Sequence, residues 1–138
     1  MNTLSKNAIV TGAGSGIGRA SALAMLRAGY SVALVGRRAE LLEETRELAD
    51  DAGERALVLA ADITDPAAVD KLFAEVKTAF GRLDVLFNNA GLNVPGVKFA
   101  DLTYEQWRSV IDINLTGSFL CAQGAFRQMK AQDPMGGR

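Results

Sequence analysis

The chain carries a glycine-rich turn at residues 11–18, Thr11-Gly12-Ala13-Gly14-Ser15-Gly16-Ile17-Gly18, which is the strongest indication of its fold class. An apolar segment, Asn7 to Thr11, runs directly into it, and a helical pattern, Ile17 to Ala28, follows. Glycines let the backbone turn sharply and approach a phosphate closely, and a helix N-terminus adds unpaired N–H groups. A tight turn that only packs helix against strand is the alternative for a glycine motif taken alone. The strand before and the helix after it favour a bound dinucleotide.

The spacing of the glycines is T-G-x-x-x-G-x-G. It departs from G-x-G-x-x-G because Ile17 stands where the third glycine of that motif would be. It is not a Walker A loop either, because no Gly-Lys-Ser/Thr follows.

Strand and helix patterns alternate along the rest of the chain. Further strands are predicted at Ser31 to Val35, Arg55 to Ala60 and Asp84 to Phe87, with helices at Ala39 to Ala52 and Pro66 to Phe80. This βαβ alternation implies parallel pairing through right-handed crossovers. The expected fold is α/β: a Rossmann-type, doubly wound parallel sheet of about four strands in the order 3-2-1-4, with helices on both faces and one domain over residues 1–138.

The last third of the chain is predicted to be mostly helical. A loop, Asn93 to Thr103, leads into a long helical region, Tyr104 to Gln132. This region is predicted either to be continuous or to be broken near Asn114. The apolar stripe of this region is larger than half a sheet requires, although core packing is the usual explanation of such a stripe. The tail, Asp133 to Arg138, is expected to be flexible. The strand Asp84 to Phe87 is left as an apolar sheet edge, so something is expected to pair with it.

Composition excludes several classes of function. Fifteen Lys and Arg against sixteen Asp and Glu give a net charge of −1, which gives no reason to expect nucleic acid or a membrane as partner. Cys121 is the single cysteine and histidine is absent, which excludes an intrachain disulfide, a histidine-dependent zinc site and a Ser-His-Asp triad. No apolar run reaches the roughly 18 residues of a membrane span, and the first strand leaves no room for a signal peptide. A cytoplasmic location is therefore expected, with no metal site.

Two arginines follow the second strand. An NAD-binding protein typically places an acidic residue there to accept a hydrogen bond from the adenosine ribose 2′-hydroxyl. Gly36, Arg37 and Arg38 occupy these positions instead, and guanidinium groups suit a 2′-phosphate. The sequence thus favours NADP(H) over NAD(H). The alternative is that both are solvated charges at the start of a helix, with Arg38 paired to a nearby Glu.

Asn88-Asn89-Ala90-Gly91 follows the fourth strand, again at the carboxyl edge of the sheet, where open α/β folds bind ligands. Taken alone, this tetrapeptide is more typical of an Asx turn. Together with residues 11–18, it resembles the classical short-chain dehydrogenase/reductase family over essentially the whole chain. Asp62 and Ile63 resemble the adenine-contacting pair of that family. The resemblance implies a cofactor site that consists of Gly12, Ser15, Gly16, Ile17, Gly18, Arg37, Arg38, Asp62, Ile63, Asn89, Ala90 and Gly91.

The same resemblance implies a catalytic role for one residue. Asn114, in Asp112-Ile113-Asn114-Leu115, is similar to the family's catalytic asparagine, which kinks its helix and supports a proton-relay water; an ordinary helix break is the alternative. The family's serine and Tyr-x-x-x-Lys are missing, because Tyr30 and Tyr104 are followed four residues later by Leu34 and Arg108. Without that proton donor, carbonyl reduction by this chain should be very slow at best.

Three hypotheses follow from these observations. The first is the N-terminal part of an NAD(P)-dependent oxidoreductase that acts on a small carbonyl or alcohol substrate, ends before the Ser and Tyr-x-x-x-Lys segment, and is a homo-oligomer when complete. The second is a stand-alone NADP(H)-binding module, or a pseudoenzyme. The third is a nonfunctional remnant.

Overall fold

Four short apolar segments form a parallel sheet. The computed structural model describes residues 5–138. The strands are β1 (Asn7–Thr11), β2 (Ser31–Gly36), β3 (Ala56–Ala60) and β4 (Val85–Phe87). Their order is β3-β2-β1-β4 and each pairing is parallel. The predicted order is confirmed, and the strand bounds lie within one residue of those predicted.

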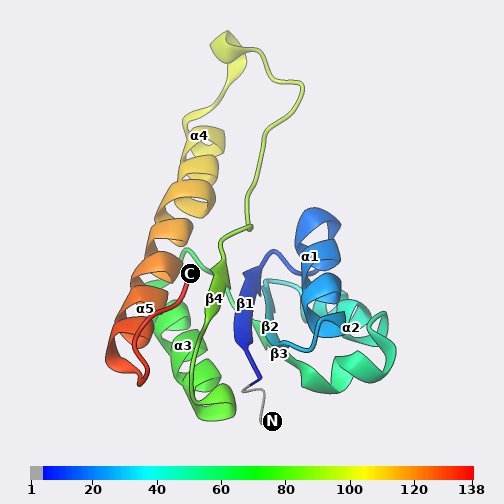
Figure 1. Ribbon diagram of the computed structural model, residues 1–138. Helices are drawn as coiled ribbons and strands as arrows, with labels where there is room; N and C mark the ends of the chain where they lie inside the picture. The colour runs from blue at the N-terminus through cyan, green and yellow to red at the C-terminus, as the bar shows by residue number, and fades with distance from the viewer. Residues whose placement is uncertain (1–4) are drawn as a thin grey trace.

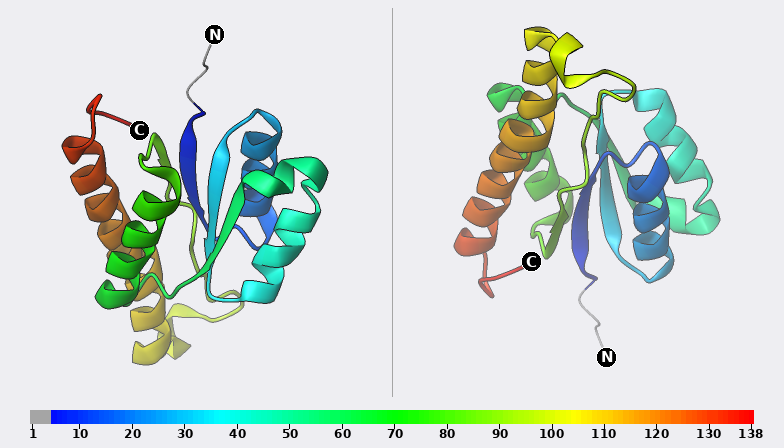
Figure 2. Two further views of the ribbon diagram at one scale, coloured as in Figure 1. Left: turned by 90° about the horizontal axis from the view of Figure 1, so that it is seen from below. Right: turned by 90° about the horizontal axis from the view of Figure 1, so that it is seen from above.

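Helices cover both faces of this sheet (Figure 1 and Figure 2). They are α1 (Gly16–Arg27), α2 (Ala39–Glu47), α3 (Pro66–Phe80), α4 (Tyr104–Ile111) and α5 (Ser118–Ala131). Successive side chains of a strand point to opposite faces. Ala8 and Val10 accordingly pack with the side chains of α1 and α2, whereas Ile9 packs with those of α3 and α5. The doubly wound architecture is therefore confirmed.

Local capping signals set the bounds of α3 as predicted. The Asp65 carboxylate accepts a hydrogen bond from the Ala67 N–H at 3.0 Å, and Pro66 occupies the first helical position. Gly81 ends the helix with φ 77°.

The prediction that the helix from Ala39 continues to Ala52 is wrong. α2 ends at Glu47, and a 3₁₀-helix, η1 (Asp50–Arg55), follows it. Asp50 has φ 50°, a left-handed conformation that an α-helix cannot contain. The chain then folds back so closely that a Cβ at Gly53 would overlap the Arg46 carbonyl.

The break predicted near Asn114 is a π-helical segment, η3 (Asp112–Gly117), between α4 and α5. A single 3₁₀ turn, η2 (Phe99–Asp101), interrupts the preceding loop. The apolar stripe of α4–α5 is only partly core. Cys121 and Ala125 are buried, but more than half of each of four large side chains is exposed: Trp107, Leu115, Phe119 and Phe126. Core packing therefore does not explain the whole stripe.

The tail expected to be flexible is instead hydrogen-bonded to β4. The Arg138 N–H donates to the Asp84 carbonyl at 2.9 Å, and the Leu86 N–H donates to the Arg138 carbonyl at 2.8 Å. This is the bonding pattern of parallel strands, with Arg138 beside Val85. The edge of β4 that we expected to need a partner is covered at this point by the chain's own last residue.

No helix within residues 5–138 is both long enough and apolar enough to cross a bilayer.

Candidate dinucleotide-binding site

A cleft lies at the carboxyl edge of the sheet. Its walls come from the turn after β1, the ends of β2 and β3, the start of α2, the loop after β4 and the η3 segment. Eight of the twelve predicted cofactor residues line it: Gly12, Ser15, Arg37, Arg38, Asp62, Ile63, Ala90 and Gly91. The other four, Gly16, Ile17, Gly18 and Asn89, lie outside its lining. Segments as far apart in sequence as Gly12 and Ile113 thus meet where open α/β sheets bind ligands.

The glycines of the turn allow a close approach between β1, α1 and the loop after β4. Gly12 has φ 67°, and a Cβ there would lie 2.9 Å from Asn89 Nδ2 and 3.1 Å from Ala90 Cα. A Cβ at Gly18 would overlap the Gly12 carbonyl oxygen. Gly16 also has a positive φ, 52°. Gly12 therefore needs glycine for both backbone conformation and space, Gly16 for conformation alone and Gly18 for space alone.

The N-terminus of α1 is free to meet an anion. Ser15 is the N-cap residue, and its side chain makes no capping hydrogen bond. The first turn of α1 contains no acidic side chain. The positive end of the helix dipole and its unpaired N–H groups are thus not neutralised by the described chain, as a phosphate-binding helix requires.

Arg37 and Arg38 lie in the cleft wall with exposed side chains. Within residues 5–138 neither guanidinium forms a salt bridge or a hydrogen bond to another side chain, so the alternative pairing of Arg38 with a Glu is not seen. Both cations are available to an anionic ligand.

The Asp62 carboxylate is held near Arg37. Its Oδ1 accepts hydrogen bonds from the Thr64 N–H at 3.0 Å and the Thr64 hydroxyl at 2.7 Å. These two bonds, and to a lesser extent the Arg37 charge, lower the pKa of Asp62 below its ordinary value. Asp62 is therefore an ionised hydrogen-bond acceptor in the cleft at neutral pH.

Asn89 braces the sheet rather than lining the cleft. Its Nδ2 donates to the Thr11 carbonyl at 3.0 Å, and its own N–H donates to Thr11 Oγ1, also at 3.0 Å. The Ala90 N–H donates to the same hydroxyl at 2.9 Å. Asn89 thereby joins the ends of β1 and β4 and positions Ala90 and Gly91, which do line the cleft.

Asn114 holds the loop after β4 against η3. Its Oδ1 accepts from the Leu92 N–H at 2.7 Å, and its Nδ2 donates to the Leu92 carbonyl at 2.8 Å. The side-chain amide is therefore engaged with one backbone residue. A Cβ at Gly91 would lie 3.1 Å from Asn114 Oδ1, so glycine is also favoured there.

Sequence reasoning missed several lining residues. Gly36 and Ala61 directly follow predicted strands, so their place at the carboxyl edge was a usable signal. Leu41 and Leu42, near the start of α2, also border the cleft, and the sequence did not indicate this. The missed set is Gly14, Val35, Gly36, Leu41, Leu42, Ala61 and Ile113.

The sheet is open and parallel, and its strand order reverses between β1 and β4. A glycine-rich strand-to-helix turn at that position is typical of nucleotide-binding α/β proteins. A model of the family described as short chain dehydrogenase matches residues 6–138. The chain belongs to the short-chain dehydrogenase family.

Two curated relatives show the extent of the similarity. Cis-4-hydroxycyclohexanecarboxylate dehydrogenase of Sinomonas cyclohexanicum is 42% identical over 124 residues, which cover 90% of this chain and 49% of that protein. Short chain dehydrogenase/reductase dpmpG of Macrophomina phaseolina is 39% identical over 132 residues, covering 95% of this chain and 75% of that protein. The chain spans about half the length of most of the curated relatives it matches.

Solved structures of short-chain dehydrogenases and reductases have the same fold as this chain. A short-chain type dehydrogenase/reductase from Mycobacterium marinum superposes with a TM-score of 0.90 at 35% identity, covering 96% of this chain and 54% of that one. A 3-ketoacyl-(acyl-carrier-protein) reductase from Brucella melitensis, complexed with NADH, gives 0.86 at 30% identity and 93% and 52% coverage. A metagenomic short-chain oxidoreductase in complex with NADP gives 0.87 at 32% identity and 95% and 59% coverage. Neighbours of this fold thus bind either nicotinamide dinucleotide.

Proposed function

We propose that this chain is the cofactor-binding part of an oxidoreductase that transfers hydride between a nicotinamide dinucleotide and a small carbonyl or alcohol, and that it binds NADP(H) in preference to NAD(H). The observation that carries the proposal is the meeting of the glycine turn, Arg37 and Asp62 in one cleft. When bound, the nicotinamide would supply the hydride donor or acceptor. The residues of this chain hold and orient the cofactor.

The pyrophosphate belongs at the start of α1. Gly12 and Gly18 keep the approach clear because side chains there would collide with Asn89, Ala90 or the turn itself. The free N–H groups and Ser15 hydroxyl supply hydrogen-bond donors without a protein carboxylate in the same turn. Ala90 and Gly91, at the other side of the cleft, are suited to the adjoining ribose.

The residues that follow β2 are better suited to the 2′-phosphate of NADP(H) than to the 2′-hydroxyl of NAD(H). Neither Arg37 nor Arg38 forms a salt bridge within residues 5–138. A 2′-hydroxyl would find no carboxylate immediately after β2, whereas a phosphate finds two guanidinium groups. Asp62 is ionised and can accept a hydrogen bond from the adenine amino group.

The proton that accompanies hydride transfer needs a donor beyond this chain's two tyrosines, neither of which has a lysine four residues on. We therefore expect the 138-residue chain to bind cofactor without measurable carbonyl reduction. Asn114 is proposed to take part in the proton path of the complete protein, with its side chain fixed by Leu92.

A homo-oligomer is proposed for the complete protein, supported by the exposed apolar side chains of α4 and α5, which include Trp107 and Phe119. The cytoplasm is proposed as its location, supported by the single cysteine, which leaves no intrachain disulfide for an oxidising compartment to form.

The test is a titration of the purified chain with NADPH and with NADH, followed by cofactor fluorescence. We expect NADPH to bind at least about tenfold more tightly, since two charge-assisted contacts to the 2′-phosphate distinguish the cofactors. No binding of either cofactor at millimolar concentration would contradict the proposed function. Equal affinities would contradict the preference alone.

A further inference from the structure

Ala13, in the middle of the glycine turn, is fully buried, and both of its backbone polar groups are hydrogen-bonded. Its N–H donates to the Val35 carbonyl at 3.1 Å. Its carbonyl accepts from Thr45 Oγ1 at 2.8 Å. Thr45 belongs to α2 and is also fully buried. A helix that is remote in sequence therefore holds a peptide plane of the phosphate-facing turn.

Because Arg19 is a donor to Thr45, the Thr45 hydroxyl proton is left for a backbone carbonyl. The Arg19 Nε donates to Thr45 Oγ1 at 2.9 Å, so the oxygen acts as acceptor in that contact. The hydroxyl has one proton to give. The Ala13 carbonyl at 2.8 Å is nearer than the Leu41 carbonyl at 3.1 Å, which is the competing acceptor one turn back on α2.

The Arg19 side chain is itself fixed by hydrogen bonds to residues of α2. Its Nη2 donates to the Leu41 carbonyl and to Glu44 Oε2, both at 3.1 Å. Because Arg19 lies in the first turn of α1, these bonds fix the start of α1 relative to α2. The Arg19–Thr45 pair thus joins both helices to the turn between β1 and α1.

The orientation of Ala13 has a consequence for Gly14. In a trans peptide the carbonyl and the following N–H point in opposite directions. The Ala13 carbonyl points to Thr45, so the Gly14 N–H points away from Thr45. Gly14 lines the cleft, and its N–H has no acceptor among residues 5–138. In the flipped peptide a carbonyl dipole would replace this donor and repel a phosphate.

We propose that Thr45 and Arg19 are positioning residues for phosphate recognition, which hold the Ala13–Gly14 peptide in its donor orientation. This inference rests on the proposed cofactor function. It predicts that the hydroxyl of a buried α2 side chain controls affinity for the pyrophosphate half of the cofactor and leaves the adenosine half unaffected.

The test compares Thr45→Val with Thr45→Ser and with a matched control, Thr78→Val. Thr78 also bonds the carbonyl four residues back, at 3.0 Å, but it lies on α3. Each variant is titrated with NADPH and with adenosine 2′-monophosphate, which lacks the pyrophosphate. We expect Thr45→Val to weaken NADPH binding about tenfold, the upper range for one hydrogen bond, with adenosine 2′-monophosphate unchanged. Thr45→Ser and Thr78→Val should retain NADPH affinity.

If Thr45→Val fails to fold, Arg19→Met provides the second test, because the Arg19 side chain is partly exposed. We expect about threefold weaker NADPH binding with the same selectivity over adenosine 2′-monophosphate. Equal losses for both ligands, or unchanged NADPH affinity in a folded variant, would overturn the inference while the proposed function stood. Failure of the unsubstituted chain to bind NADPH would overturn the proposed function and the inference with it.

Discussion

Gly12 and Gly29 separate two reasons why a residue must be glycine. Both have positive φ, 67° and 93°, so alanine is strained at either position by about 1 kcal/mol. Only at Gly12 would the new Cβ also meet neighbouring atoms, at 2.9 Å from Asn89 Nδ2, while Gly29 has open space. The backbone strain and the steric collision can therefore be measured apart.

We expect Gly12→Ala to lower the melting temperature more than Gly29→Ala and to abolish NADPH binding, because the collision displaces the loop after β4. Gly29→Ala should lower stability by about 1 kcal/mol and leave binding intact. Differential scanning calorimetry and fluorescence titration measure the two effects. Equal losses of stability, with binding preserved in both, would show that the close approach is unimportant.

The proposed preference for NADP(H) depends on Arg37. Arg37→Asp replaces a cation by a carboxylate that can accept from a ribose 2′-hydroxyl. We expect NADPH affinity to fall by at least about tenfold and NADH affinity to rise, since the substitution removes an attraction and adds a repulsion for the 2′-phosphate. Lys71→Asp makes the same charge change on an exposed part of α3 and serves as the control. An unchanged preference in Arg37→Asp would refute the ribose assignment.

The lowered pKa of Asp62 predicts a pH dependence of stability. A carboxyl group whose pKa is lower in the folded state stabilises the fold fully above its unfolded pKa, near 3.8, and this contribution is lost as the pH falls through the folded-state value. In the variant Asp62→Asn, the side-chain amide could still accept from Thr64 but would not titrate. Urea unfolding should give a stability difference between the two proteins that is constant above about pH 5 and shrinks below about pH 4. A difference that persists unchanged at lower pH would contradict this explanation.

At the scale of elements, the sequence predicted what local chemistry determines. The bounds of α3 followed from Asp65, Pro66 and Gly81, which act within one turn of the helix. The end of α2 did not, because an aspartate tolerates the left-handed conformation without requiring it, and its adoption at Asp50 depends on how η1 packs back on α2. Local signals fix both ends of α3, whereas tertiary contacts decide where α2 ends.

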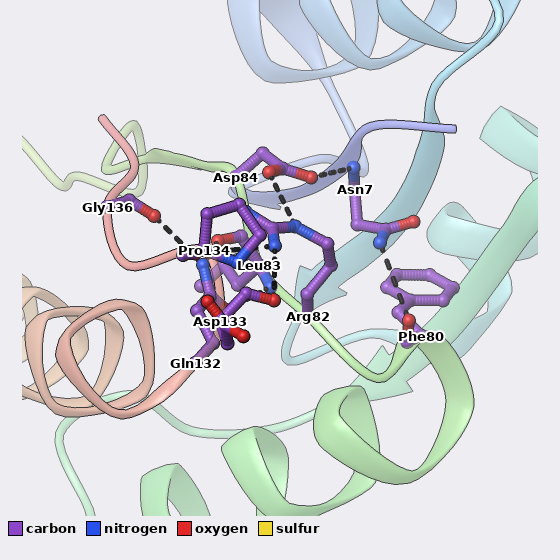
Figure 3. Close-up of polar contacts among 9 residues, drawn as sticks. All are labelled: Asn7, Phe80, Arg82, Leu83, Asp84, Gln132, Asp133, Pro134 and Gly136. Carbon is purple, nitrogen blue, oxygen red and sulfur yellow. Dashed lines mark hydrogen bonds and ion pairs between the residues drawn. The ribbon is translucent and has the colours of Figure 1, made fainter. Parts of the chain in front are cut away.

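The C-terminal turn is another element that only contacts distant in sequence define. Gln132, at the end of α5, accepts from the Leu83 N–H at 3.0 Å and donates to the Leu83 carbonyl at 2.7 Å and the Gly136 carbonyl at 2.8 Å (Figure 3). Arg82 and Asp84 form an ion pair at 2.9 Å beside it, and the Asp84 carboxylate also accepts from the Asn7 N–H. These contacts join α5, the start of β4 and the start of β1.

We expect Gln132→Ala to destabilise the fold by about 1–2 kcal/mol, because the buried Leu83 would lose its partners for both backbone groups. Gln128→Ala is the matched control. It lies one turn earlier on α5, and its buried Nε2 has no hydrogen-bond partner within residues 5–138. Hydrogen exchange should show faster exchange at Leu83 and Leu86 in Gln132→Ala alone. Equal stability of the two variants would contradict the role of Gln132.

At the scale of the whole molecule, strand order brings the cleft together. The alternation of strands and helices predicted the order, and the resemblance to the short-chain dehydrogenase/reductase family implied eight of the lining residues. They lie together because the carboxyl ends of strands in a parallel sheet share one edge. It could not separate Asn89 from Ala90, since only the β1–β4 pairing directs the Asn89 amide to Thr11. Nor could periodicity show that Trp107 and Phe126 are exposed, because a stripe has the same pattern whether or not another surface covers it.

The most direct test of the central claim is a ¹⁵N–¹H NMR titration of the 138-residue chain with NADPH. The cofactor should shift the amide signals of the glycine turn, Arg37, Asp62 and Gly91 together and saturably, because these residues surround one cleft. Signals of Lys77 and Arg127, which border a separate groove between α3 and α5, should stay in place. No shifts at millimolar NADPH, or shifts confined to that second groove, would contradict the assignment of the cleft as the dinucleotide site.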